Sequence, residues 1–251
     1  MKTSKTSPIP RNRLARLAHL GSLAGSVAGG MLAEGLRQVA RGNIPRAPDL
    51  VLTPSNARRV ADKLSELRGA AMKVGQLLSM DTGDLLPPEL AAILAGLRAD
   101  ARPMPMSQVV RAMEQSFGPG WEKAFRRFSF TPMAAASIGQ VHAAITHGER
   151  HLALKIQYPG IRQSIDSDVN NVATLLRISR LVPEELALEP LLQEAKRQLH
   201  EEADYLREAG HLQHFAMLLE DAPEFLVPGV DEDLTRQNIL AMDLLVGEPI
   251  E

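Results

Sequence analysis

The stretch "MAAASIGQVHAAITHGERHLALKIQ", residues 133–157, decides the fold. Two runs within it, "GQVHAAIT" and "HLALKIQ", are rich in residues that favour strands, and His147-Gly148 separates them with a turn signal. Two such runs on either side of a short turn predict a pair of antiparallel strands. The rest of the chain is assigned outward from this hairpin.

Shorter strand-like runs lie on both sides of the hairpin. The segment "FRRFSF", residues 125–130, predicts a third antiparallel strand, and Pro132 separates it from the hairpin. The tail "FLVPGVDEDLTRQNILAMDLLVGEPIE" predicts two more strands with a turn at Asp231–Asp233. Helical patterns cover residues 164–181 and 191–219. Antiparallel strands with helices collected on one side indicate the α+β class.

The first half of the chain has a helical pattern. After Ser55, a good N-cap, apolar residues recur at steps of three and four, until Gly83 and Pro87 end the run. That stripe consists of Val60, Leu64, Leu67, Ala71, Val74 and Leu78. Two further helices are expected at residues 87–100 and 106–118. Within the first helix, Gly75 costs about 1 kcal/mol relative to alanine, so it indicates either close packing at that point or neutral drift.

The composition excludes several classes of function. Because the chain has no cysteine, it has no disulfides, thiolate metal sites or cysteine nucleophiles. Its histidines lack the spacing typical of a zinc site. The net charge of −2 conceals a basic start, since residues 1–46 hold eight Lys or Arg and one acid, Glu34. Nucleic acid is not expected as a partner.

The basic start flanks a Gly-rich segment in which Gly21, Gly25 and Gly29 recur at every fourth position. This spacing is typical of close helix packing in membranes, and the nearby arginines suit anionic head groups. The segment is too short and too weakly hydrophobic to predict a membrane span. A flexible leader and peripheral membrane contact both stay open, and we expect a cytoplasmic location with a peripheral membrane location as the alternative.

Three features of the second half carry candidate chemistry. Small residues before Ser137 and Gly139 allow backbone N–H groups to approach an anion such as phosphate, although a tightly packed hairpin explains them equally well. Lys155 lies among apolar strand residues and needs a partner or a ligand, because burying an unpaired ammonium is costly; the alternative is a lysine at a sheet edge that extends its ammonium into solvent. Acids crowd the later helix, where Asp204 and Glu208 share a face if the helix is continuous. A solvated acidic face is the alternative explanation.

The segment "SIDSDVNN" offers alternating oxygen ligands at Asp166, Asp168 and Asn170. Hard cations prefer such ligands, but the glycine and the distal glutamate of an EF-hand loop are missing. Helix N-capping is therefore the favoured interpretation of these residues.

The order of these features resembles the UbiB family of atypical kinase-like proteins, which is associated with ubiquinone (coenzyme Q) biosynthesis. The segment "AAMKVGQLLSMD" is similar to the family's KxGQ motif, and "AAASIGQVH" is similar to its Ala-rich loop. The segment "LALKIQYPG" is similar to its strand lysine motif, and "EADYLREA" to its ExD motif with the following glutamate. Together these four motifs cover residues 55–251 in the family's order.

The resemblance implies a fold and a domain organisation. Residues 119–251 would form a protein-kinase-like small lobe, with a five-stranded antiparallel sheet plus helices. A helical extension carrying the KxGQ motif, residues 55–118, would precede it, after a basic Gly/Ala-rich leader and linker at residues 1–54. The family's C-terminal lobe is expected to be absent, because no catalytic-loop Asp with its Asn and no DFG metal ligand follow the hinge-like strand "ILAMDLL".

The resemblance also implies a cofactor site. Lys155 would contact the phosphates of a nucleotide while it pairs with Glu208. The loop that covers the nucleotide would consist of Ala134, Ala135, Ala136 and Ser137. The implied cofactor is ATP or ADP, with Mg²⁺ expected only in the complete protein.

A second group of residues would provide the family's catalytic features. Lys73 and Gln76 of the extension would lie near the ExD acids, Glu202 and Asp204. On an ideal helix these two acids face nearly opposite ways. We therefore expect Glu202 to face the extension and Asp204 to lie on the side of Glu208.

The function implied by the family is that of an ATPase or small-molecule kinase supporting ubiquinone biosynthesis, here as a fragment. Its expected partners are a nucleotide and ubiquinone-biosynthesis proteins, while a membrane lipid, a quinone precursor and a homodimer stay open. The alternative is a non-catalytic helical scaffold or a lipid-associated binding module, which would use the basic leader and the long helices alone.

Overall fold

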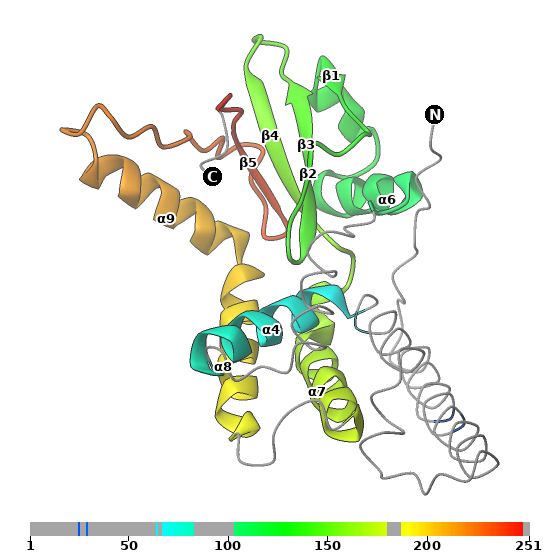
Figure 1. Cartoon of the computed structure of the whole chain (residues 1–251). Helices are drawn as coiled ribbons and strands as arrows, with labels where there is room; N and C mark the ends of the chain where they lie inside the picture. The colour runs from blue at the N-terminus through cyan, green and yellow to red at the C-terminus, as the bar shows by residue number, and fades with distance from the viewer. Residues whose placement is uncertain are drawn as a thin grey trace, which may run out of the picture. The chain divides into compact units, whose positions relative to one another are not determined.

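The computed structural model describes residues 64, 67–82, 103–179 and 187–247, together with Gly25 and Gly29 (Figure 1). These residues belong to two compact units that alternate along the chain. The sheet unit holds residues 103–161 and 200–247, and the helical unit holds residues 64, 67–82, 162–179 and 187–199. This division differs from the linear boundaries expected from the sequence, because residues 106–117 group with the sheet and residues 162–199 do not.

The sheet unit is built on a five-stranded antiparallel sheet, as the sequence predicted. Its strands are β1 (Arg127–Phe128), β2 (Ala134–Ala135), β3 (Gly139–Ile145), β4 (His151–Gln157) and β5 (Ile239–Asp243). The order across the sheet is β1-β3-β4-β5, and β2 also pairs with β3. The hairpin β3–β4 is its centre, in register from Gly139 opposite Gln157 to Ile145 opposite His151. The helix α6 (Met106–Phe117) contacts β4, and α9 (Tyr205–Leu218) contacts β5.

One of the five strands differs in place from the expectation. In the described tail only β5 forms a strand, and Val230 makes a single bridge to Met242, so the prediction of two tail strands is wrong. Pro223 and Pro228 explain the failure, because proline cannot donate a backbone hydrogen bond to a ladder. The additional strand is β2, which lies within the Ala-rich segment that the sequence assigned to a loop.

Side chains alternate across β4, and this alternation sets the place of Lys155. One face carries Leu152, Leu154 and Ile156, all fully buried. The opposite face carries Ala153, Lys155 and Gln157. Lys155 therefore shares its face with a small residue and a polar residue rather than with the three large apolar neighbours in the sequence.

Gly139 lies where β3 and β4 approach most closely. A Cβ atom built on Gly139 would overlap with the carbonyl oxygen of Ile156 and lie 3.2 Å from the Cα of Gln157. The tightly packed hairpin that the sequence left open therefore explains this glycine.

A buried polar chain crosses the face of β3 that lies opposite Lys155. The backbone N–H of Met104 donates to Gln140 Oε1 over 2.8 Å, and Gln140 Nε2 lies 2.7 Å from His142 Nε2. His142 Nδ1 lies 2.7 Å from the Ser129 carbonyl oxygen. Since that carbonyl only accepts, Nδ1 carries the proton and Nε2 accepts from the Gln140 amide. His142 is therefore neutral in the folded protein.

His142 makes folding stability depend on pH. Burial lowers its pKa from the ordinary 6.5, and the hydrogen bond to the Ser129 carbonyl offsets this only in part. The unfolded chain therefore binds a proton more readily, so stability is full above about pH 6.5 and is lost as the pH falls through the folded pKa. Urea unfolding between pH 7.5 and 5 should show a smaller decrease for His142→Gln than for the native chain. The exposed His147→Gln is the control and should keep the native decrease; a native-like decrease in His142→Gln would contradict the assignment.

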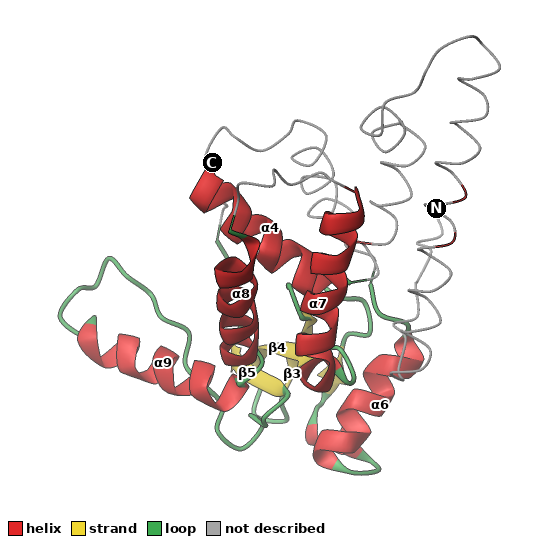
Figure 2. Cartoon of the chain, turned by 90° about the horizontal axis from the view of Figure 1, so that it is seen from below, coloured by secondary structure: helices red, strands yellow, loops and turns green. Residues whose placement is uncertain are grey.

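The helical unit contains α4 (Arg68–Thr82), α7 (Ile161–Ser179) and residues 188–199 of α8 (Leu188–Glu202). Figures 1 and 2 show α7 and α8 running side by side, with α4 crossing them. The apolar stripe predicted for the first helix is confirmed at Leu64, Ala71, Val74 and Leu78, which are each 1% exposed, whereas Leu67 lies in a turn before α4 and is only partly buried. Gly75 is buried in the same helix. Close packing against Gly75, rather than neutral drift, stays a prediction.

Several expectations lie outside the described residues: Ser55 and Val60, the helix at 87–100 and most of the leader. Gly25 and Gly29 are helical and exposed. The helix predicted at 106–118 is confirmed as α6. None of the described helices is long and apolar enough to cross a membrane.

The segment around Asp166, Asp168 and Asn170 lies inside α7, which begins at Ile161. The favoured N-capping role is therefore wrong, because the helix has already started five residues earlier. Asp168 is buried and accepts a hydrogen bond of 2.7 Å from the hydroxyl of Ser164. In the described part of the chain no group of three His, Cys, Asp or Glu side chains could hold a metal ion.

The helix expected at 191–219 is two helices, α8 and α9, separated at Ala203 and Asp204. Asp204 is the N-cap of α9, and its carboxylate accepts from the backbone N–H of Arg207 over 3.2 Å. That N–H would otherwise bond to the Ala203 carbonyl, which accepts from Gln157 Nε2 over 2.8 Å instead. Aspartate competes with helical hydrogen bonds in this way at caps, so the assumption of one continuous helix was wrong.

Candidate functional site

The strand lysine forms a close ion pair with a carboxylate from α9. Lys155 Nζ lies 2.7 Å and 2.9 Å from the two carboxylate oxygens of Glu208. Lys155 is 20% exposed and Glu208 is 34% exposed, so the pair is partly shielded but reachable from solvent. The ion pair that the resemblance implied is present, and it meets the requirement that a lysine in an apolar strand must find a partner.

The ring of Tyr205 lies against the ammonium of Lys155 in this ion pair. The ammonium of Lys155 lies 4.8 Å from the centre of the Tyr205 ring, which is a cation–π distance. Tyr205 itself is fully buried. Burial, followed by the negative charges of Glu208 and Glu202, raises the pKa of its phenol far above the ordinary value. Tyr205 is therefore a neutral platform that holds Lys155 in place.

The Ala-rich loop is tied to the end of α8 by one side-chain hydrogen bond. Ser137 Oγ donates to Glu202 Oε2 over 2.8 Å, joining residues 65 positions apart in the sequence. Ala134 and Ala135 form β2 and are exposed, and Ala136 N–H donates to the Gly139 carbonyl. The segment thus presents small side chains to solvent, while its backbone is paired with β3.

The acids expected near the lysine lie in different places. Asp204 is the N-cap of α9 and accepts from the Arg207 backbone N–H, so it is not on one continuous helix with Glu201; that it lies on the side of Glu208 stays a prediction. Glu201 instead forms an ion pair with Arg207, with Arg207 Nη1 3.1 Å from Glu201 Oε1. Arg207 Nε also lies 3.3 Å from His211 Nε2.

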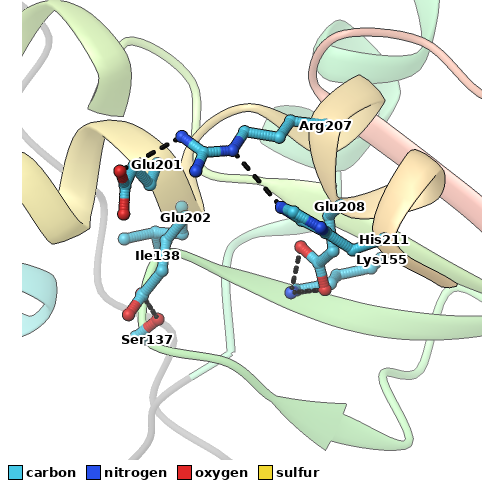
Figure 3. A pocket seen from close by; sticks show the side chains of 8 residues that line it. All are labelled: Ser137, Ile138, Lys155, Glu201, Glu202, Arg207, Glu208 and His211. Carbon is cyan, nitrogen blue, oxygen red and sulfur yellow. Dashed lines mark hydrogen bonds and ion pairs between the residues drawn. The ribbon is translucent and has the colours of Figure 1, made fainter. Parts of the chain in front are cut away.

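These groups surround one cavity of about 390 Å³ in the sheet unit (Figure 3). Its lining comes from the loop after β2, from β4, from the end of α8 and from α9. The lining residues are Ser137, Ile138, Lys155, Glu201, Glu202, Arg207, Glu208 and His211. Three acidic and two basic side chains, Lys155 and Arg207, thus line the cavity, and Figure 3 shows Arg207 between Glu201 and His211, with Lys155 against Glu208.

This set of donors suits a phosphate group. Lysine and arginine are side chains that proteins use for phosphate, and the hydroxyl-bearing Ser137, at the end of the small-residue segment, lines the same cavity. The cavity is also large enough for a small-molecule ligand. The residues present therefore fit the phosphate chain of a nucleotide.

The two KxGQ residues belong to the helical unit, on α4. Gln76 is exposed, and Lys73 is partly buried. The pKa of Glu194 on α8 is lowered to about 2, chiefly by hydrogen bonds from Arg197 and Gln198 and to a lesser degree by the charge of Lys73. Lys73 is thus near Glu194. That Lys73 and Gln76 act together with Glu202 and Asp204 stays a prediction.

Sequence reasoning missed Arg207 and His211. They are four residues apart and therefore share a face of α9, and Arg207 immediately precedes the glutamate that holds Lys155. The sequence signal for this site was the pair of Arg207 and His211 close to Glu208. The prediction of one continuous acidic helix left this signal unused.

Comparison with known proteins identifies the family of the chain. Residues 96–251 match the family model described as the ABC1 atypical kinase-like domain. The Saccharomyces cerevisiae protein "Atypical kinase COQ8, mitochondrial" is 44% identical, over 99% of this chain and 50% of its own length. The Marinobacter nauticus "Probable protein kinase UbiB" is 32% identical, over 78% of this chain and 36% of its own length.

One solved structure is also similar, "The complex structure of Rv3197-erythromycin from Mycobacterium tuberculosis". It is 32% identical, covers 78% of this chain and 49% of its own, and superposes with a TM-score of 0.47. The chain spans about half the length of the curated relative from yeast. Because the family model covers more than half of the sequence, from residue 96 to residue 251, the chain belongs to the family of ABC1 atypical kinase-like proteins, which includes COQ8 and UbiB.

Proposed function

We propose that this chain binds ATP or ADP in the cavity beside the Lys155–Glu208 ion pair, as part of an atypical kinase or ATPase that supports ubiquinone biosynthesis. The observation that carries the proposal is the ion pair itself, at 2.7 Å, in the lining of a cavity that Ser137 and Arg207 also line. In kinase-like proteins a strand lysine held by a helix glutamate contacts the nucleotide phosphates.

Each residue has a distinct part in the proposed binding. Lys155 binds a phosphate oxygen, Glu208 and Tyr205 orient its ammonium, and the backbone of Ala134–Ser137 covers the phosphate chain. The hydrogen bond from Ser137 to Glu202 holds that loop over the cavity. Bound ATP supplies a transferable phosphoryl group, and Mg²⁺ shields its charge. Lys73, Gln76, Glu202 and Asp204 are proposed as the catalytic group that acts in the complete protein.

Titration calorimetry on the full chain tests this function. ATP and ADP should bind with micromolar to millimolar affinity and should displace each other. Adenosine should bind more weakly, because it lacks the phosphates that Lys155 recognises. Absence of ATP and ADP binding at millimolar concentration would reject the proposed function.

The Ala-rich loop should set nucleotide preference. Ala135 of β2 pairs with Gln140 of β3. Glycine at position 135 would loosen this pairing because it has greater backbone freedom. Ala135→Gly is therefore expected to change the ratio of ATP to ADP affinity several-fold, measured by competition titration. The matched control Ala143→Gly lies on β3 away from the cavity lining and should leave the ratio unchanged. An unchanged ratio in Ala135→Gly would mean that the loop does not contact the nucleotide.

A lipid-associated binding module is the second candidate, and one observation favours it. The end of α9 and the segment after it expose the large apolar side chains of Phe215, Met217, Leu218, Phe225 and Leu226. Exposed apolar patches mark interaction surfaces. Co-sedimentation with vesicles that is lost on Phe215→Ser but kept on Lys155→Ala would support this function over nucleotide binding.

A further inference from the structure

We propose that Arg207 is a second phosphate-binding residue of this cavity and that it recognises the end of a nucleoside triphosphate chain. Glu201 and His211 hold its guanidinium in position for that contact. The inference rests on the proposed nucleotide-binding function and specifies which ligand class the site prefers, namely triphosphates over diphosphates.

Lys155 alone cannot account for a triphosphate. An ammonium has three N–H donors, and two of them go to the oxygens of Glu208 at 2.7 Å and 2.9 Å. The ring of Tyr205 lies against the same ammonium. Lys155 therefore has one N–H donor left, which is enough to bind one phosphate group.

Arg207 has the donors that Lys155 lacks. A guanidinium offers five N–H donors in a planar fork, a shape that matches phosphate. Nη1 contacts Glu201 and Nε contacts His211, while Nη2 makes no contact with any described residue. The side chain is 51% exposed and lines the same cavity as Lys155. Its Nη2 edge can thus bind a ligand without breaking either existing contact.

The end of α8 explains why the site needs this second cation. Glu201 and Glu202 are the last two residues of α8, where the helix dipole already places partial negative charge. With Glu208 they bring three carboxylates to the cavity wall. A polyphosphate approaching these carboxylates is repelled unless a cation stands between them, and Arg207 is paired directly with Glu201.

Arg207→Ala tests the proposal through its dependence on phosphate number. Calorimetry on the full chain should show ATP affinity lower by about tenfold, since a charge-assisted contact is lost. ADP affinity should fall less, and adenosine affinity should not change. Arg207→Lys keeps the charge without the fork and should restore part of the ATP affinity. Arg111→Ala, an exposed arginine on α6 outside the cavity lining, is the matched control and should bind ATP like the native chain. Thermal unfolding checks that every variant is folded.

The outcomes separate the two proposals. Native ATP affinity in Arg207→Ala, or equal losses for ATP and adenosine, would overturn the role of Arg207 while leaving nucleotide binding intact. A native chain that binds neither ATP nor inorganic tripolyphosphate would overturn both. If tripolyphosphate binding is lost in Arg207→Ala, and ATP binds the native chain no more tightly than tripolyphosphate does, the phosphate contact is supported and recognition of the nucleoside is rejected.

Discussion

Replacing Lys155 with alanine is expected to reduce ATP affinity by roughly 10- to 100-fold. The phosphates would lose a charge-assisted hydrogen bond of about 1.5–3 kcal/mol, and each 1.4 kcal/mol is tenfold in affinity. The variant also leaves Glu208 without its partner, so its charge would repel the phosphates at the same place. Calorimetric titration with ATP measures the loss directly.

Two controls make this result specific. Lys123→Ala removes an exposed lysine outside the cavity lining and should bind ATP like the native chain. Glu208→Gln should reduce affinity less than Lys155→Ala, because the ammonium stays but is held less firmly. Unchanged ATP affinity in a folded Lys155→Ala variant would show that the nucleotide binds elsewhere.

Replacing Gly139 with alanine is expected to destabilise the protein by about 2–3 kcal/mol. The new Cβ would overlap with the Ile156 carbonyl oxygen and lie 3.0 Å from the attached carbon. These are backbone atoms of the adjacent strand, so the strands must separate where the sheet is best packed, and overpacking of this kind costs about 1–3 kcal/mol or more. The melting temperature should fall by roughly 4–12 °C in a calorimetric scan.

The sign of this effect is informative, because exposed Gly→Ala changes at compatible positions stabilise proteins by about 0.4–1 kcal/mol. Gly148 in the β3–β4 turn is the matched control, since a Cβ there would meet only Thr146 Oγ1 at 3.9 Å. Gly148→Ala should leave the melting temperature unchanged or raise it slightly. If Gly139→Ala is as stable as Gly148→Ala, the close approach of β4 to Gly139 is not present in solution.

The centre of the fold followed directly from the sequence. The hairpin of β3 and β4 has two strand-forming runs on either side of a turn. In β4 the large apolar residues alternate as in a half-buried strand, whereas the buried face of β3 carries the polar Gln140 and His142. The ion pair of Lys155 with Glu208 was anticipated from a charged residue in an apolar strand together with the family motifs. The buried apolar stripe of α4 could be predicted because its apolar residues recur at regular steps of three and four.

The errors have local physical causes. The break between α8 and α9 depends on Gln157, which lies 46 residues before Ala203. The side-chain amide of Gln157 donates to the Ala203 carbonyl, which a continuous helix would use for its own backbone hydrogen bond. No periodicity within the helix reveals that competitor. Strand β2 is two residues long and formed by alanines, which have little strand propensity, so only its pairing with β3 identifies it. Arg207 was missed because its acidic partner Glu201 lies on α8, six residues earlier, across a break between the helices that the sequence did not predict.

Hydrogen exchange with and without ATP and Mg²⁺ is the most direct test of the proposal that a nucleotide binds beside Lys155. The account predicts that ATP slows exchange of backbone amides in residues 134–138 and in the first turn of α9, and that Lys155→Ala removes this protection. It also predicts little change in residues 162–179 of α7. Protection confined to the helical unit, or none in residues 134–138 at saturating ATP, would contradict the account.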